Sequence, residues 1–388
     1  MPSNKKTQIL LATRPLVPPW DEASKNFAYF LAKSIQDPQL EFHLLTAPET
    51  LEGLGSNCVQ HPIFRSGRFD FEAKARLAMF LGTKGRSFDI VHFLFTPTPL
   101  NAFLAKHLVG THPKTVQTIA TLREERWNET DWKRMFFANR LVTYTNHSKQ
   151  KLEEAGFANV DRIYPGIDLE RFSPKPKDPK TLATLNLSPN DFVISYVGEY
   201  ARLGATDMIV DMLVKHLPKT PTRHLREDVS RKGLKFLFAL RVKNESDAKK
   251  KEEITEKFRQ AGILDSIRFS DTVSDVAALY NIADIVTFPV ADMHGKFDVP
   301  LVILEAYACS RPVILSDLSL FREFSNPRIS ATIPPCNSEA LWQKISEIQR
   351  DSDFSKDLGA NALIFVKEYF NLKNTAESYS LFYQNLKV

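Results

Sequence analysis

The sequence has few cysteines and no long apolar run, and each shortage excludes a class of protein. Cys58, Cys309 and Cys336 are odd in number and far apart. This pattern is typical of a reducing compartment and argues against a disulfide framework or a cysteine metal site. No stretch of about 18 consecutive apolar residues occurs, so the sequence predicts no membrane-spanning helix. We therefore expect a cytoplasmic protein, and any contact with a membrane would be peripheral, at the bilayer surface.

The sequence also lacks the large basic excess of a nucleic-acid-binding protein. Lysine and arginine outnumber aspartate and glutamate by five, and the whole excess lies in residues 1–175, which hold 23 basic and 18 acidic residues. A modestly basic first half suits an anionic partner, such as a membrane surface or a charged acceptor molecule. We expect no nucleic-acid partner, and the sequence leaves the oligomeric state open.

Patterns typical of metal sites are missing too. His92, His147 and His294 are scattered and have no partners at metal-ligand spacing. Asp351-Ser-Asp353 is the only Asp-x-Asp in the chain, and it falls between predicted helices, where aspartate and serine serve as caps. We therefore expect neither a metal nor any other cofactor.

Apolar segments of strand length alternate with amphipathic helical segments in both halves of the chain. Alternation of this kind predicts two doubly wound α/β domains with parallel sheets that face a central cleft. Four prolines between Phe172 and Pro189 predict an interdomain linker. The predicted strands are Gln8–Ala12, Phe42–Thr46, Asp89–Phe95, Thr115–Ala120, Leu141–Tyr144, Phe192–Val197, Lys235–Ala239, Ile267–Phe269, Ile285–Phe288 and Val313–Leu315.

One predicted helix, over Phe69–Phe80, is both apolar and basic. Lys74 and Arg76 lie within it, and Lys84 and Arg86 follow. Such a helix is often a surface helix with a solvated face, and it also suits attachment to an anionic membrane surface. Both interpretations stay open at this point.

The segment after Ile285–Phe288 carries the first indication of function. Pro300 fixes the start of a helix that buries Leu301, Val302, Leu304 and Ala308 and holds Glu305 in its body. A helix that begins at the carboxyl edge of a parallel sheet offers unpaired N–H groups to an anionic ligand. The sequence therefore predicts an anion site at this edge.

Three segments, Asp298–Ile314, Tyr164–Pro174 and Asp271–Asp284, together resemble the retaining GT-B glycosyltransferases of family four. The resemblance runs nearly end to end. It implies two Rossmann-like domains, an acceptor-binding domain over residues 1–175 and a nucleotide-sugar-binding domain over residues 176–367. Residues 368–388 would form a helix that crosses back to the first domain.

The resemblance also implies roles for individual residues. Glu305 matches the glutamate that accepts hydrogen bonds from the ribose, although a helix carboxylate can also simply face solvent. Ser270 and Val273 lie in the loop that supports the nucleotide base. Asp298 and the backbone of Val299, Leu301 and Val302 would address the sugar and the phosphates.

The sequence departs from the family pattern at four places. Phe297 stands where an acid is usual, eight residues before Glu305. Glu199 and Leu203 stand at the arginine and lysine positions of the diphosphate loop. Ala120 replaces a frequent histidine, and Ala23 lies where the family has a glycine pair. We expect these changes to alter recognition of the sugar and the phosphates.

Other cations can take the place of the missing arginine and lysine of the diphosphate loop. Arg202, Arg241 and Lys243 follow strands that end at the same sheet edge, so they can supply the positive charge, unless they are plain surface charges. Lys25, at the start of a helix, is a further candidate for a phosphate contact. A lysine at that place can equally be an exposed side chain without a ligand.

The resemblance implies metal-independent transfer of a hexose, with retained anomeric configuration, from a UDP- or GDP-linked donor to a hydroxyl of a glycan or lipid-linked acceptor. In that reaction the donor phosphate accepts the proton, and Glu305, Asp298 and Arg202 are the predicted catalytic residues. A sugar-nucleotide epimerase or phosphorylase on the same fold is an alternative. The four departures also suit a GT-B protein that has lost catalysis and serves as a binding or scaffold partner.

Overall fold

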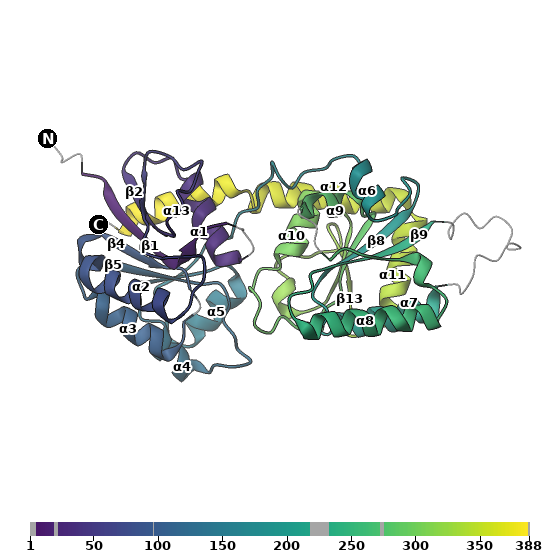
Figure 1. Cartoon of the computed structure of the whole chain (residues 1–388), viewed down its shortest axis with the longest axis horizontal. Helices are drawn as coiled ribbons and strands as arrows, with labels where there is room; N and C mark the ends of the chain where they lie inside the picture. Colours follow the sequence, from purple (N-terminus) through teal and green to yellow (C-terminus); the bar gives the residue numbers. More distant parts are fainter. Residues whose placement is uncertain (1–4, 19–21, 96, 218–232, 272–274, 387–388) are drawn as a thin grey trace, which may run out of the picture. The chain divides into compact units, whose positions relative to one another are not determined.

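The computed structural model describes residues 5–18, 22–95, 97–217, 233–271 and 275–386, and its chain forms two compact units (Figure 1). Unit 1 comprises Met1–Gly166, Gly295–Val299 and Leu372–Val388. Unit 2 comprises Ile167–His294 and Pro300–Asn371. Five residues from the middle of the second half, 295–299, thus belong to unit 1.

Unit 1 contains a seven-stranded parallel sheet with the order β3-β2-β1-β4-β5-β6-β7. The order of strands reverses between β1 and β4, which is the place where ligands bind in open α/β sheets. The strands are β1 (Thr7–Leu16), β2 (Leu40–Thr46), β3 (Cys58–His61), β4 (Ile90–Phe93), β5 (Lys114–Ile119), β6 (Arg140–Thr143) and β7 (Val160–Arg162).

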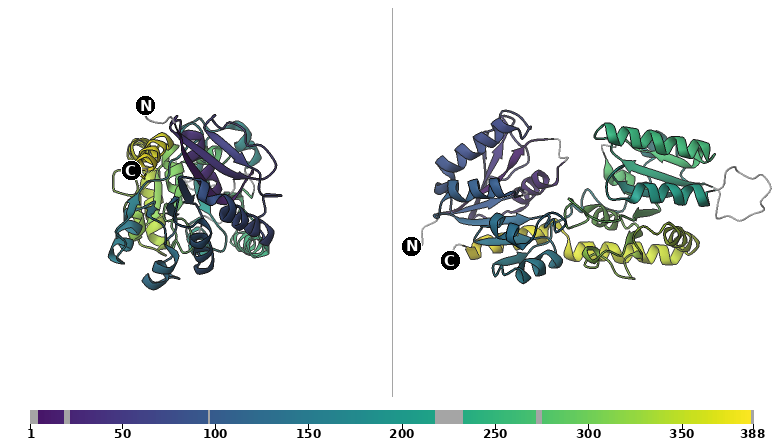
Figure 2. Two further views of the ribbon diagram at one scale, coloured as in Figure 1. Left: turned by 90° about the vertical axis from the view of Figure 1, so that its left-hand side faces the viewer. Right: turned by 90° about the horizontal axis from the view of Figure 1, so that it is seen from below.

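Helices cover both faces of this sheet, because successive side chains of a strand point to opposite sides. Ile9 and Leu11 of β1 pack on the side of α1 and α13, whereas Leu10 and Ala12 pack on the side of α2 and α3. Figures 1 and 2 show these two layers. The helices of unit 1 are α1 (Ala23–Ser34), α2 (Phe71–Lys84), α3 (Pro99–Val109), α4 (Glu129–Met135), α5 (Asn146–Glu154) and α13 (Leu372–Leu386).

Unit 2 contains a six-stranded parallel sheet with the order β10-β9-β8-β11-β12-β13. Its order reverses between β8 and β11, so the second unit has a switch point of its own. The strands are β8 (Phe192–Gly198), β9 (Leu234–Leu240), β10 (Ile267–Phe269), β11 (Ile285–Phe288), β12 (Val313–Ser316) and β13 (Ala331–Ile333). The helices are α6 (Pro179–Thr184), α7 (Ala205–His216), α8 (Glu245–Gln260), α9 (Val276–Ile282), α10 (Leu301–Ala308), α11 (Ser338–Arg350) and α12 (Ser352–Tyr369).

The predicted α/β class with two doubly wound parallel sheets is confirmed, and each predicted strand is present. The strands β3, β7 and β13 escaped prediction because they are short edge strands of three or four residues. The predicted cap of the first helix, Asp21, lies outside the described residues. Glu22 caps α1 through its carboxylate, which accepts a hydrogen bond from the Lys25 N–H.

The proline-rich segment Phe172–Pro189 is not a free linker over its length. It contains α6, and Leu182, Leu185 and Leu187 are buried in the core of unit 2. The chain instead leaves unit 1 after Gly166, and its last segment in unit 1 begins at Leu372. A Cβ atom on Gly166 would lie 2.3 Å from the Leu372 Cα, so only glycine fits at this close approach.

Among the described helices, none has the length and apolar character needed to cross a bilayer.

Candidate active site

Glu305 lies on α10, the helix that follows β11 in unit 2. Ile303, Leu304 and Tyr307 anchor this helix in the core, while Glu305 is only partly covered. The Tyr280 hydroxyl donates a hydrogen bond of 2.8 Å to the Glu305 Oε2. Burial of the carboxyl group raises its pKa to about 7, although Tyr280 and the charge of Arg171 act in the opposite direction. The group can therefore exist in both protonation states near neutral pH.

The first turn of α10 leaves two backbone donors open. Pro300 precedes the helix and offers no side-chain cap. The N–H groups of Ile303 and Leu304 donate to the Pro300 carbonyl at 2.9 and 3.4 Å. The N–H groups of Leu301 and Val302 have no acceptor within the part of the chain that the structure describes. Both residues are partly exposed, so the prediction that the helix buries them is wrong. Open donors at a helix N-terminus suit an anion.

The three cations predicted for the diphosphate differ in their surroundings. Arg202, Arg241 and Lys243 are all exposed. The Lys243 Nζ lies 2.6 Å from the Glu199 Oε1, so the acid that replaces the family arginine offsets the charge of this lysine. Arg241 forms no ion pair with any described residue and remains the stronger candidate for a phosphate.

Ser270 lies at the end of β10, where it is buried, and its N–H donates to the Phe238 carbonyl at 3.0 Å. Its Oγ atom, the Tyr200 hydroxyl and the Asp271 Oδ1 are buried atoms that find no hydrogen-bond partner among the described residues. Buried polar atoms normally have partners, so several lacking one near strand ends suit a ligand or bound water. Tyr200 was not predicted, and Val273 lies outside the described residues.

Asp298 belongs to unit 1, unlike Glu305. Its side chain is 7% exposed. Its carboxylate accepts hydrogen bonds from the Ser148 hydroxyl at 2.5 Å and from the Leu122 N–H at 3.1 Å. Its own N–H donates to the Ala120 carbonyl at 2.9 Å. Burial raises the pKa of Asp298 to about 7, against the lowering effect of these donors. Val299, the next residue, is also buried.

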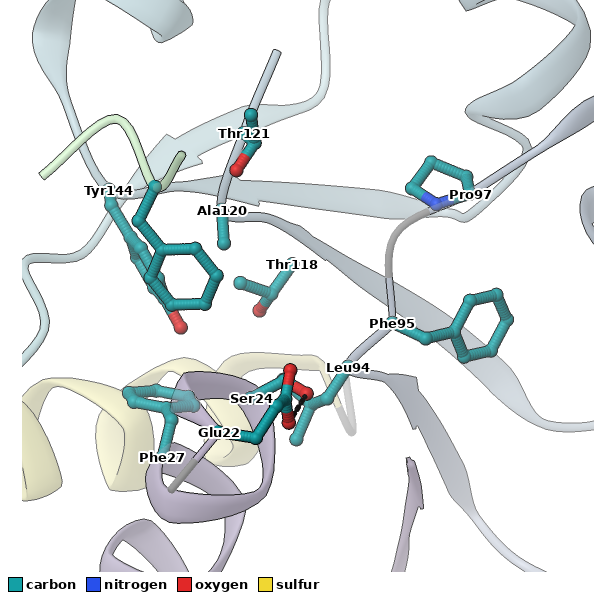
Figure 3. Close-up of a pocket in the computed structure, with 11 residues that line it drawn as sticks. Glu22, Ser24, Phe27, Leu94, Phe95, Pro97, Thr118, Ala120, Thr121 and Tyr144 are labelled. Atoms are coloured by element: carbon teal, nitrogen blue, oxygen red, sulfur yellow. Dashed lines mark hydrogen bonds between the residues drawn. The ribbon is translucent and has the colours of Figure 1, made fainter. Parts of the chain in front are cut away.

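A small cavity of about 40 Å³ lies at the carboxyl end of the unit 1 sheet (Figure 3). Phe297, the residue in place of the usual acid, is part of its wall, and its ring lies 6.1 Å from that of Tyr144. Glu22 and Ser24, joined by a 2.7 Å hydrogen bond, provide polar groups. The lining residues are Glu22, Ser24, Phe27, Leu94, Phe95, Pro97, Thr118, Ala120, Thr121, Tyr144 and Phe297.

The other two residues predicted near this edge open α1. Ala23 is the first residue of the helix, and Lys25, two residues later, is 8% exposed. The sequence left open that Lys25 is an exposed side chain, and the structure shows that it is buried. Whether Ala23 and Lys25 contact a phosphate stays a prediction.

A buried hydrogen-bonded network supports the cavity. His92 Nε2 lies 2.7 Å from the Thr118 hydroxyl, and His92 Nδ1 lies 2.6 Å from the Tyr383 hydroxyl. Burial lowers the pKa of His92 to about 3, so the ring is neutral at ordinary pH. This network fixes α13 to β4 and β5. No local pattern in the sequence predicts this network, because Tyr383 is 291 residues from His92.

The described residues contain no group of three or more histidine, cysteine, aspartate or glutamate side chains that could hold a metal ion.

Comparison with known protein families matches both units. The family Glycosyltransferase Family 4 matches residues 26–171, and Glycosyl transferases group 1 matches residues 192–351. The chain belongs to glycosyltransferase family 4. The family resemblance drawn from the three sequence segments is thus confirmed for both halves of the chain.

Individual relatives share the family at low identity. The D-inositol 3-phosphate glycosyltransferase of Salinispora arenicola is 26% identical over 236 residues, which cover 58% of this chain and 50% of that protein. The chain thus spans half the length of this curated relative.

Solved structures show the fold. HepE of Anabaena, in complex with UDP and glucose, has a TM-score of 0.72 at 14% identity and covers 98% of this chain and 100% of its own. Sucrose-phosphate synthase of Thermosynechococcus elongatus has a TM-score of 0.75 at 17% identity and covers 98% and 99%. The predicted GT-B fold is thus confirmed for this member of the family.

Proposed function

We propose that this glycosyltransferase moves a hexose from a nucleotide-diphosphate sugar to a hydroxyl of a glycan or lipid-linked acceptor, with retained anomeric configuration. Family membership supports transfer of a sugar. The complex of HepE with UDP and glucose supports a nucleotide-sugar donor. The name of the Salinispora relative, a D-inositol 3-phosphate glycosyltransferase, supports an acceptor that carries hydroxyl and phosphate groups.

The observation that carries the proposal is the pairing, on one short helix, of a partly open carboxylate with two open N–H groups. Glu305 has one acceptor oxygen engaged by Tyr280, and its other oxygen has no partner among the described residues. That oxygen suits the two hydroxyls of a ribose, which are hydrogen-bond donors. The N–H groups of Leu301 and Val302, about one turn earlier, suit phosphate oxygens.

Side chains of unit 2 complete the donor site in this proposal. Arg241 provides the main positive charge for the diphosphate, with Arg202 and Lys243 as further cations. Lys243 reaches a phosphate only by leaving Glu199, which weakens its contribution. Ser270 supports the base, and its open Oγ suits a polar atom of that base.

The proposed reaction needs no covalent nucleophile. The bond between the anomeric carbon and the phosphate oxygen breaks, the acceptor oxygen bonds to that carbon on the same face, and the acceptor proton passes to the departing phosphate. Cations and N–H groups stabilise the negative charge that develops on the diphosphate, and this stabilisation replaces a metal. Contacts of Asp298 and the Val299 backbone with the sugar remain part of the proposal.

The acceptor side of the proposal rests on unit 1. The cavity beside Ala120 presents the Glu22 carboxylate and the hydroxyls of Ser24 and Thr118 at a switch point of the sheet. Polar groups of this kind suit the hydroxyls of a sugar or an inositol. Lys25 would contribute a cation where the acceptor carries a phosphate.

Thermal unfolding with UDP, GDP or ADP tests the donor site. A nucleotide that binds the folded protein alone raises the melting temperature with its concentration. We expect one of these nucleotides to raise the melting temperature. The rise is expected to be smaller for Glu305→Ala. Arg241→Ala is expected to reduce the rise more with the nucleoside diphosphate than with the nucleoside. Lys356→Ala, an exposed site in α12, serves as the control.

No shift with any nucleotide would contradict the donor site. A normal shift without sugar transfer to any acceptor would instead support the alternative of a GT-B protein that binds without catalysis.

A further inference from the structure

The outward faces of α2 and α3 carry large apolar side chains in contact with solvent. These two helices pack side by side in unit 1, and a Cβ atom on Gly82 of α2 would lie 3.4 Å from Leu108 of α3 (Figure 1). Their inner faces fill one core cluster with Leu77, Leu81 and Val109. The exposed apolar side chains are Phe71 (86% exposed), Met79 (64%), Leu100 (69%), Phe103 (58%) and Leu104 (44%).

Helical periodicity places these residues on the side opposite the core. Phe71, Ala75 and Met79 recur at intervals of four, and all three are exposed, whereas Ala73, Leu77 and Leu81 are buried. Leu100, Phe103 and Leu104 share the outer face of α3 in the same way. Large apolar side chains gathered in this number on neighbouring helices mark an interaction surface rather than scattered exposure.

The charge around this surface is positive. Residues 65–109 hold seven lysines and arginines and three acids. The three acids have structural duties, because Asp70 caps α2, Glu72 pairs with Arg65 and Arg76, and Asp89 accepts a hydrogen bond from the Gln8 N–H. Arg68, Lys74, Lys84, Arg86 and Lys106 are exposed basic residues around the apolar side chains.

We propose that the outer face of α2 and α3, defined by the five exposed apolar residues and the five basic residues just named, docks on an anionic phospholipid bilayer. Phenylalanine and leucine side chains enter the boundary between head groups and acyl chains, while lysine and arginine stay at the level of the phosphates. The surface is larger than the single helix over Phe69–Phe80 that the sequence indicated. Leu100, Phe103 and Leu104 of α3 were not part of that expectation, and Arg76 is engaged with Glu72.

A second copy of this chain fits the surface less well. A two-fold symmetric contact would bring the same basic residues of both copies together, and like charges oppose such an interface. A bilayer with acidic lipids offers opposite charge and an apolar phase at once. The proposal rests on this surface and does not depend on sugar transfer.

Sedimentation with vesicles tests the surface. The full chain is mixed with vesicles of phosphatidylcholine alone, or of phosphatidylcholine with 30% phosphatidylglycerol, a composition on the order of natural anionic membranes. We expect at least about tenfold stronger binding to the anionic vesicles, and weaker binding as salt rises, because salt screens exposed charges.

Matched variants separate the apolar and the basic contributions. We expect Leu100→Ser/Phe103→Ser to lose about tenfold or more in vesicle binding, while Ile364→Ser, an equally exposed apolar residue of α12, binds like the unchanged protein. Lys74→Glu/Lys106→Glu is expected to abolish the preference for anionic vesicles. Lys180→Glu/Lys356→Glu changes the net charge by the same amount at sites outside this surface, and this variant is expected to keep the preference for anionic vesicles.

Three results would overturn the proposal: no binding to anionic vesicles, binding that the surface variants leave unchanged, or a dimer in ultracentrifugation that Leu100→Ser/Phe103→Ser dissociates while vesicle binding stays the same. The last result would assign the face to a second copy. Circular dichroism and the nucleotide-induced melting shift are measured on every variant, so that misfolding or failure of the donor site is recognised separately.

Discussion

Asp298 and Glu305 are seven residues apart in the chain, and burial raises the pKa of each carboxyl group to about 7, yet their surroundings differ. Asp298 is 7% exposed and holds the Ser148 hydroxyl and the Leu122 N–H within unit 1. Glu305 is partly exposed in unit 2 and has the Tyr280 hydroxyl on one oxygen. A raised pKa therefore does not by itself mark a ligand site, and the unused acceptor capacity of Glu305 is the distinguishing feature.

The largest difference between the two carboxyl groups is expected in nucleotide affinity. Glu305→Ala removes the proposed acceptor for the ribose hydroxyls. Hydrogen bonds to a charged group contribute about 1.5–3 kcal/mol, so we expect roughly 10- to 100-fold weaker nucleotide binding. Asp298→Asn is expected to stay within about twofold of the unchanged protein. Calorimetric titration at pH 8 measures both variants, and equal losses would remove the distinction.

For folding stability, in contrast to nucleotide affinity, we expect an effect from the contacts of Asp298. Ser148→Ala leaves the buried Asp298 carboxyl with fewer donors, and loss of such a partner costs about 1–3 kcal/mol of unfolding free energy. Nucleotide affinity is expected to stay unchanged. Denaturant unfolding measures the loss against Ser378→Ala, an exposed serine of α13 in the same unit. A Ser148→Ala protein as stable as this control would show that the Asp298 contacts carry little stability.

The protonation of Glu305 predicts a pH dependence of donor binding. In the proposed donor site, ribose hydroxyls donate to the carboxylate, and with a pKa of about 7 its ionised fraction falls about tenfold between pH 8 and pH 6. We therefore expect the affinity for a nucleotide sugar to fall about tenfold over this range and to become flat in Glu305→Gln. A nucleotide sugar is used because its diphosphate does not titrate here. The same slope in both proteins would place the titrating group elsewhere.

The smallest effect is expected from the partner of Glu305. The Tyr280 hydroxyl stabilises the carboxylate, so Tyr280→Phe raises the pKa of Glu305 further. We expect about threefold weaker nucleotide-sugar binding at pH 7, which recovers towards the unchanged protein at pH 9. A deficit that persists at pH 9 would mean that Tyr280 acts on the ligand by another route than this carboxyl group.

The sequence names both carboxyl groups as site residues, but it indicates the local setting of Glu305 alone, for a physical reason. The helix after Pro300 and its Glu305 follow from local spacing, because proline, apolar anchors and carboxylate lie within a few residues. The partners of Asp298 come from positions 150 and 176 residues away, which no local pattern reveals. For the same reason the pairing of Lys243 with Glu199, 44 residues apart, and the network of His92 with Tyr383 were not predicted.

The strands show the same limit at the level of the fold. Buried central strands such as β8 and β11 are apolar runs that the sequence displays directly. The edge strands β3, β7 and β13 are short, and β3 and β7 contain polar residues along their length, so their strand character comes from pairing with a neighbour rather than from local pattern. Thr118 likewise joins Glu22 and Ser24 at the cavity of unit 1 only through the fold of the sheet.

Hydrogen exchange of the backbone amides, with and without saturating UDP or GDP, tests most directly whether unit 2 carries the nucleotide site. The account predicts slower exchange at Leu301 and Val302, which have open N–H groups, and in the residues that follow β8 and β9. It predicts no change around Ser148 and Leu122, the partners of Asp298 in unit 1. Protection confined to unit 1, or none at saturation, would contradict it.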